Sequence, residues 1–175
     1  MTTTSTDAWQ RTGGLLLALA GALSGELGSG IALAADTGAP PTPSPSAAVD
    51  PLAAARARIA EKKWDAALQE LKRVNASGNA DWNNLMGYTL RKQATPDLEG
   101  AERFYNEALR IDPKHRGALE YSGELYLMKG DLPTAEKRLA TLDKVCTFGC
   151  EQYTDLKKSI ERYKAAGNKY VATTY

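Results

Sequence analysis

The chain has 175 residues, of which 43% are hydrophobic and 25% are charged, and its formal net charge is +1. This composition is close to that of an average soluble globular protein, which excludes a chain disordered throughout and a strongly basic nucleic-acid-binding arm. Two cysteines are also too few for a domain held together mainly by disulfides.

Residues 1–34 have the order of features that is typical of a secretory signal peptide. A polar start containing Arg11 leads into an apolar run over residues 13–23, and residues 32–34 (Ala-Leu-Ala) form a small-x-small cleavage site. The apolar run is shorter than the roughly 20 residues that span a bilayer as a helix. We therefore predict cleavage after Ala34 and a periplasmic or secreted protein. The alternative is an uncleaved leader, the one route by which this sequence predicts contact with a membrane.

Residues 35–48 are predicted to form a proline-rich linker. This stretch contains four prolines and shows no apolar period. Such a composition favours an extended, polyproline-like spacer over a packed element. The spacer would join the leader to the helical part of the chain.

Three segments after the linker share one pattern of small and large side chains. The first is divergent, and its matching positions are Ala55, Trp64, Ala67, Leu71 and Val74. The second has two extra residues in its turn, and its matching positions are Gly87, Leu90, Ala101, Tyr105, Ala108 and Pro113. The third follows the offsets W-x2-L-G-x2-Y…A-x3-F most closely, at Leu119, Gly123, Tyr126, Ala135 and Leu139.

This pattern resembles the tetratricopeptide repeat family over residues 49–150. The resemblance implies an all-α fold, a short solenoid of about three helix-turn-helix repeats. The end of such an array needs a helix with one apolar and one polar face. Residues 151–167 are predicted to supply that capping helix, because Tyr153, Leu156, Ile160 and Tyr163 form one apolar stripe. Gly167 is expected to end the helix, and residues 168–175 to form a tail.

Small residues are expected where the two helices of each hairpin cross. Gly87 on a first helix would face Ala101 on the second, and Gly123 would face Ala135 in the same way. A larger side chain at these positions would push the two backbones apart.

Three X-Pro pairs predict helix starts. Asp50, Thr95 and Asp112 each precede a proline. A side-chain acceptor at the N-cap followed by proline at the first helical position is a common way to begin a helix.

Cys146 and Cys150 lie in the turn between the third hairpin and the predicted capping helix. An exported chain with two cysteines favours a disulfide, which would fix the last helix to the array. A thiol-disulfide redox site is the alternative. The spacing here is one residue longer than the C-x-x-C of most redox sites, which favours the structural disulfide.

The sequence predicts no enzyme, no cofactor and no metal site. The single histidine, His115, has no second histidine or cysteine at ligand spacing, and we expect it to be an exposed residue in a first helical turn. Glu120 and Glu124 have the i,i+4 spacing of an acid/base pair, but solvated carboxylates on a groove wall are the favoured interpretation. No basic stripe interleaved with aromatic residues is present, so nucleic-acid binding is not expected.

The resemblance to the tetratricopeptide repeat family implies a concave groove lined by the first helix of each repeat. Tyr88 is the most attractive anchor for a partner, because exposed aromatic residues carry much interface energy. Basic side chains are expected at one end of the groove and acidic ones at the other. The groove positions carried over from the family are Arg56, Ile59, Asp81, Asn84, Tyr88, Arg91, Glu120, Glu124, Leu127 and Met128.

The function expected from these features is non-catalytic binding of a peptide or partner protein in the groove, in the cell envelope. Two alternatives remain at this stage. One is a thiol-disulfide redox protein that uses Cys146 and Cys150. The other is a purely architectural module that forms oligomers.

Overall fold

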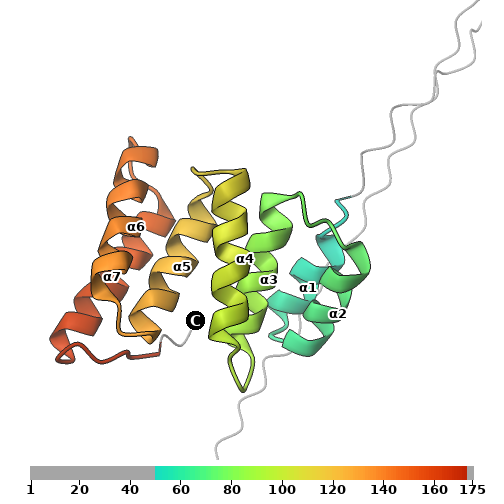
Figure 1. The fold of residues 1–175 in the computed structure, drawn as a ribbon, viewed down its shortest axis with the longest axis horizontal. Helices are drawn as coiled ribbons and strands as arrows, with labels where there is room; N and C mark the ends of the chain where they lie inside the picture. The colour runs from blue at the N-terminus through green and yellow to red at the C-terminus, as the bar shows by residue number, and fades with distance from the viewer. Residues whose placement is uncertain (1–49, 173–175) are drawn as a thin grey trace, which may run out of the picture. The chain divides into compact units, whose positions relative to one another are not determined.

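The computed structural model describes residues 50–172. These residues form seven α-helices and no strand, which confirms the all-α fold class (Figure 1). The predicted leader at 1–34 and linker at 35–48 lie outside the described residues, as does the end of the predicted tail. The helices are α1 (Ala53–Ala60), α2 (Trp64–Val74), α3 (Ala80–Lys92), α4 (Leu98–Ile111), α5 (Arg116–Met128), α6 (Leu132–Val145) and α7 (Glu151–Ala165).

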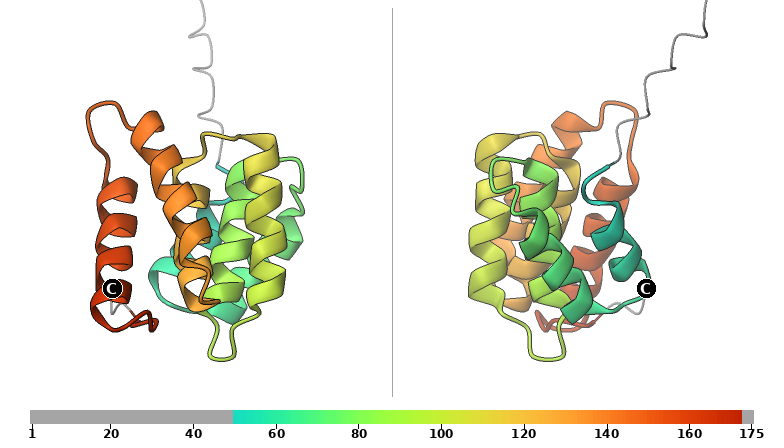
Figure 2. Two further views of the ribbon diagram at one scale, coloured as in Figure 1. Left: turned by 60° about the vertical axis from the view of Figure 1, so that its left-hand side comes forward. Right: turned by 90° about the vertical axis from the view of Figure 1, so that its right-hand side faces the viewer.

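Helices that follow one another in the chain also pack on one another. Within residues 50–172, α1 packs on α2, α3 on α4, and α5 on α6, so that each pair forms a helical hairpin. Contacts between α2 and α3 and between α4 and α5 join the hairpins in chain order, as the ribbon views show (Figures 1 and 2). The last helix, α7, packs on both α5 and α6.

Side-chain caps fix the starts of the later helices, but not at the positions predicted from proline. Asp97 accepts a hydrogen bond from the backbone N–H of Gly100 at the start of α4, and His115 Nδ1 accepts one from Ala118 at the start of α5. The predictions of Thr95 and Asp112 as N-caps are therefore wrong.

The reason for this displacement is visible at Asp112, whose carboxylate closes a local turn instead. Its Oδ1 accepts a hydrogen bond from the N–H of Lys114, two residues on, and the helix begins only after that turn. Asp50 behaves alike: its Oδ1 accepts from the N–H of Leu52, and α1 begins at Ala53. The sequence therefore located these turns correctly and placed the helix starts two or three residues early.

Gly87 is required by the close approach of α3 and α4. A Cβ atom built on Gly87 would lie 2.8 Å from the ring of Tyr105 and 3.0 Å from the carbonyl oxygen of Ala101, both on α4. This contact agrees with the predicted crossing. At Gly123 the prediction is wrong in its partner, because the nearest atoms are those of Leu156 on α7, at 2.6 Å, rather than those of α6.

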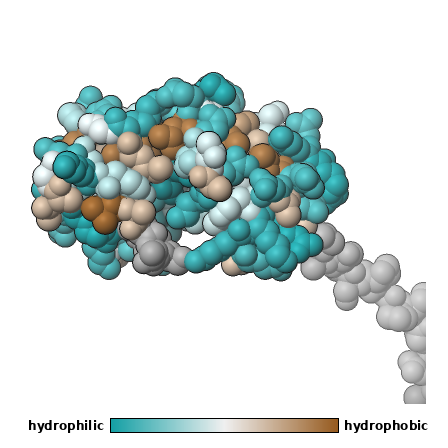
Figure 3. All heavy atoms as spheres, turned by 90° about the horizontal axis from the view of Figure 1, so that it is seen from below, coloured by the Kyte–Doolittle hydropathy of each residue, from teal (hydrophilic) through white to brown (hydrophobic). Residues whose placement is uncertain are grey.

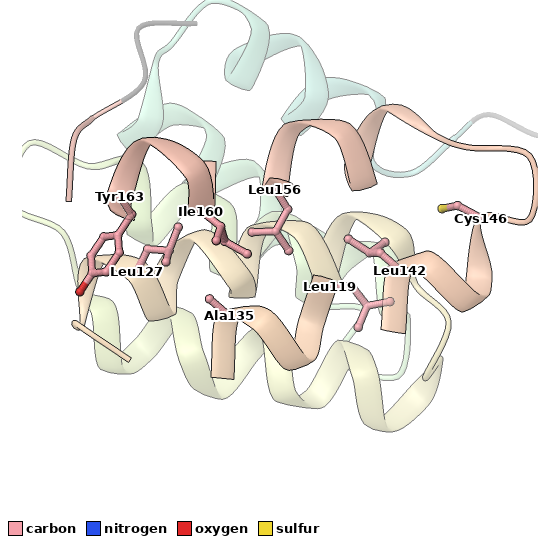
Figure 4. Close-up of a cluster of buried hydrophobic side chains, with 8 residues drawn as sticks. All are labelled: Leu119, Leu127, Ala135, Leu142, Cys146, Leu156, Ile160 and Tyr163. Carbon is pink, nitrogen blue, oxygen red and sulfur yellow. The ribbon is translucent and has the colours of Figure 1, made fainter. Parts of the chain in front are cut away.

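The largest buried cluster in the described chain joins α7 to the third hairpin (Figure 4). Leu156, Ile160 and Tyr163, three members of the predicted stripe, are 0–4% exposed and point at α5 and α6. Tyr153, the fourth member, is half-buried against the same cluster. Gly167 follows the helix at a φ of +68°, which agrees with its predicted role in ending α7.

Cys146 and Cys150 form a disulfide, with their Cα atoms 5.6 Å apart. Cys146 ends α6 and is buried in the cluster beneath α7, while Cys150 is the N-cap residue of α7. The predicted staple between the last hairpin and the final helix is therefore present.

The face of the molecule drawn in Figure 3 is mostly hydrophilic, with hydrophobic residues gathered in small patches. Phe148 is the most exposed large hydrophobic residue of the described chain, and it stands in the disulfide loop. None of the helices within residues 50–172 has the length and apolar character needed to cross a membrane.

Candidate functional site

A pocket of about 270 Å³ opens between α3, α5 and α7. Each of these helices contributes three side chains to its wall, and we call it the α3–α5–α7 pocket. Four of the predicted groove residues lie in it. Its lining residues are Tyr88, Arg91 and Lys92 from α3, Glu120, Tyr121 and Glu124 from α5, and Glu151, Gln152 and Asp155 from α7.

A buried ion pair joins two of the helices in this wall. Arg91 Nη2 lies 2.8 Å from Glu124 Oε2, and the two side chains are only 2% and 5% exposed. Arg91 Nε also lies within 3.4 Å of the hydroxyl oxygen of Tyr105. Burial acts to lower the pKa of Arg91, but its interactions with Tyr105 and Glu124 outweigh that effect, and the net shift of the pKa is upward. Arg91 is therefore a permanent cation held by α5.

Glu124 also ties α5 to α7. Its Oε1 accepts a hydrogen bond of 3.2 Å from the hydroxyl of Ser159, which in turn accepts one of 2.9 Å from Arg162 Nη2. Glu124 thus contacts groups from both neighbouring helices, which fixes the relative positions of the pocket's three walls.

This pairing corrects the predicted charge distribution. Arg91 and Glu124 were expected at opposite ends of a groove, and Glu120 and Glu124 were expected to be solvated. The structure buries all three residues, with Glu120 at 8% exposure, and places Arg91 in contact with Glu124. Their spacing along each helix was known from the sequence, but the rotation of α3 against α5 was not.

Two tyrosines form the aromatic part of the pocket wall. The rings of Tyr88 and Tyr121 have centroids 4.6 Å apart, and the guanidinium carbon of Arg91 lies 5.6 Å and 5.8 Å from them. Tyr88 also meets the edge of Trp64 on α2, with centroids 6.0 Å apart. Tyr88 is therefore half-buried, and its ring is held in place by neighbours on three sides.

Lys92 stands at the same wall, with Nζ 5.8 Å from the centroid of the Tyr88 ring. Burial lowers its pKa, and the nearby charge of Arg91 lowers it further. The pKa of Glu120 moves in the opposite direction, to about 8, because burial and the charges of Glu124 and Asp155 disfavour its carboxylate form. The pocket therefore holds an acid whose protonation changes near neutral pH.

Arg56 and Asp81, also predicted for the groove, form a separate ionic cluster. Arg56 Nη2 lies 3.3 Å from Asp81 Oδ2, and His115 Nε2 lies 2.9 Å from Asp81 Oδ1. The expectation that His115 is exposed is wrong, since its side chain is 13% exposed. His115 joins the start of α5 to α3 because its two ring nitrogens bind different helices.

The other predicted groove residues are spread through the interior. Asn84 is buried beside Gly117, and Ile59 is half-buried against the cluster formed by α1 to α3. Met128 contacts the pocket only through Arg91, whose Nη1 lies 4.0 Å from its Sδ. Leu127 is 1% exposed and belongs to the core beneath α7, so its predicted position in a groove is wrong.

The α7 wall of the pocket was missed by sequence reasoning. Residues 151–167 were interpreted as a cap because of their apolar stripe, and the polar positions were left to solvent. Glu151 and Asp155 have the same i,i+4 spacing as Glu120 and Glu124. This shared spacing, with one acidic pair on α5 and one on α7, is the feature of the sequence that could have indicated acidic side chains on two walls of one pocket.

Within residues 50–172, no three or more histidine, cysteine, aspartate or glutamate side chains are grouped so as to hold a metal ion. Neither a protein-family model nor a curated protein sequence gives a significant match to the chain.

Proposed function

We propose that this chain is an exported, non-catalytic tetratricopeptide repeat protein that binds a peptide segment of a partner protein in the α3–α5–α7 pocket. The repeat offsets in the sequence support the family, and the packing of consecutive helical hairpins is compatible with it. The exported location is supported by the leader pattern in residues 1–34 and by a disulfide, which persists in oxidising compartments.

The observation that carries the binding role is the composition of the pocket wall. Two tyrosine rings in tilted contact are combined with charged groups from three helices, and ion pairs and ring contacts hold several of these side chains in place. Such a wall offers aromatic surface and directional polar groups with little side-chain entropy left to lose on binding. A peptide is the ligand class suited to a pocket that is open at the surface and of mixed polarity.

A display library of random peptides tests this function. The bait is the protein purified after export of the full chain, and its matched variant is Gln152→Trp, which places a large ring at the pocket wall. Lys157→Trp introduces the same ring at an exposed position of α7 outside the pocket lining. We expect peptides that bind the wild type and Lys157→Trp but not Gln152→Trp. Peptides that bind all three proteins equally, or none that bind at all, would refute pocket binding.

A further inference from the structure

The α3–α5–α7 pocket carries more negative than positive charge. Its lining includes four carboxylates, Glu120, Glu124, Glu151 and Asp155, and two cations, Arg91 and Lys92. Arg91 and Glu124 neutralise one another in their buried ion pair. Three acidic side chains on α5 and α7, Glu120, Glu151 and Asp155, therefore line the pocket with a single remaining cation on α3, Lys92.

Glu120 is the group that points to a ligand. It is 8% exposed and lines the pocket, yet it makes no hydrogen bond or ion pair with any residue in the described part of the chain. The carboxylate oxygens themselves open to the pocket, since they are not among the enclosed unpaired polar atoms of the described chain. A carboxylate on so little exposed a side chain loses much of its hydration, which is unfavourable unless a charged partner compensates. Glu124, one helical turn away, shows the contrast, because it is buried to a similar degree and has two polar partners, Arg91 on α3 and Ser159 on α7.

Lys92 does not serve as the missing partner. Its ammonium group lies over the Tyr88 ring and forms no ion pair with Glu120. The lowered pKa of Lys92 and the raised pKa of Glu120 have the same leading cause, burial. Lys92 and Glu120 thus line the same pocket from different helices without forming an ion pair.

We propose that the pocket accepts a cationic side chain, lysine or arginine, of the bound peptide, and that this cation pairs with Glu120. Glu151 and Asp155 on the α7 wall add to the attraction, and Asp155 is held only weakly by Lys158, at 3.9 Å. The ring faces of Tyr88 and Tyr121 contact the aliphatic stem of the incoming residue. This inference rests on the proposed function, because it names the residue type that the peptide presents.

The pairing makes binding depend on pH. Free Glu120 is largely protonated below its pKa of about 8 and releases its proton to solvent when the cation binds. Affinity for the cation therefore increases as the pH rises toward about 8 and then levels off. The charged and titratable groups that face Glu120 across the pocket are Tyr88, Arg91 and Lys92 on α3, Tyr121 and Glu124 on α5, and Glu151 and Asp155 on α7.

The inference is tested by NMR titration of the exported protein with acetyl-Gly-Lys-Gly-amide. Acetyl-Gly-norleucine-Gly-amide is the matched neutral probe, and n-butylammonium is the matched cation without a peptide backbone. We expect backbone amide shifts around Glu120 and Asp155 with the lysine peptide, weaker binding of butylammonium, and none with norleucine. Glu120→Gln should weaken binding of the lysine peptide at least about tenfold and remove its pH dependence. Glu161→Gln, which removes a carboxylate from an exposed position of α7, should leave binding unchanged.

Several outcomes would overturn the inference. Equal binding of the lysine and norleucine peptides, or of wild type and Glu120→Gln, would show that the cation is not recognised. Butylammonium binding as tightly as the peptide would assign the site to a free amine. In the display screen, pocket-dependent peptides without lysine or arginine would overturn this inference while the proposed function stands. The absence of any pocket-dependent peptide would instead refute the proposed function.

Discussion

Arg91 on α3 and Glu124 on α5 form an ion pair of 2.8 Å that is almost completely buried. Removal of one partner leaves an uncompensated charge in the interior, which is far more costly than loss of an exposed pair. We therefore expect Arg91→Met to lower the free energy of unfolding by about 3–5 kcal/mol, measured by urea denaturation. Arg110→Met, which breaks the exposed pair with Glu107, should leave it nearly unchanged.

A double variant distinguishes the contribution of the ion pair to stability from the contribution of side-chain packing around Arg91. Arg91→Met with Glu124→Leu removes both buried charges and should be more stable than Arg91→Met alone, because no unpaired charge remains. Equal losses in the single and double variants would show that the destabilisation comes from packing around Arg91 and not from its charge.

Glu120 should oppose folding at neutral pH. Because its pKa is raised in the folded protein to about 8 from a usual value near 4.5, its ionisation is more costly in the folded than in the unfolded state. The penalty is absent below about pH 4, grows as the pH rises, and is complete above about pH 8. Glu120→Gln should therefore unfold like the wild type near pH 4 and be more stable by at least about 1 kcal/mol at pH 8.

The control for this prediction is Glu161→Gln, whose stability should follow the wild type at both pH values. Thermal denaturation monitored by circular dichroism would provide the comparison. A pH-independent difference between Glu120→Gln and the wild type would mean that Glu120 is ionised to the same extent in the folded and unfolded states.

Gly87→Ala should destabilise the contact between α3 and α4. The added Cβ would lie 2.8 Å from the Tyr105 ring and 3.0 Å from a backbone oxygen that cannot move independently. We expect a loss of about 1–3 kcal/mol by urea denaturation, despite the better helix propensity of alanine. Gly78→Ala is the matched control, because a Cβ at Gly78 would meet nothing within 4 Å. Similar effects at the two glycines would contradict the close approach of α3 and α4.

Loss of the disulfide should lower the free energy of unfolding only modestly. The bond joins Cys146 to Cys150, four residues apart, and closing so short a loop removes little entropy from the unfolded chain, worth about 2 kcal/mol. Cys146→Ser with Cys150→Ser should lower the free energy of unfolding by about that amount and increase hydrogen exchange first in α7. Increased exchange beginning in α1 or α2 instead would argue against a local role for the bond.

Features that depend on neighbouring residues could be predicted from the sequence. The α7 stripe of Leu156, Ile160 and Tyr163 follows the helical period, and each of these side chains is buried as expected. Gly87 could be placed at a helix crossing because its partner lies in the same hairpin. The disulfide could be predicted because the sequence has exactly two cysteines behind an expected export signal.

Features that depend on how distant helices rotate against one another could not be predicted. The Arg91–Glu124 pair joins helices of different hairpins, and Leu156 packs against Gly123 between the final helix and the third hairpin. The helix starts at Asp97 and His115 were displaced for a local reason, since the turn before each cap uses additional residues that a short cap-plus-proline pattern does not represent.

The Cys146–Cys150 disulfide links the redox state of the chain to the position of the α7 wall of the pocket. Cys150 immediately precedes Glu151, so the bond anchors the very residues that begin the α7 wall of the pocket. In a reducing cytosol this anchor does not form, and α7 is then held by packing, by the hydrogen bond of Ser159 to Glu124 and by the ion pair of Lys164 with Glu136 on α6. Oxidation would therefore add a covalent restraint at the residue where the α7 wall of the pocket begins.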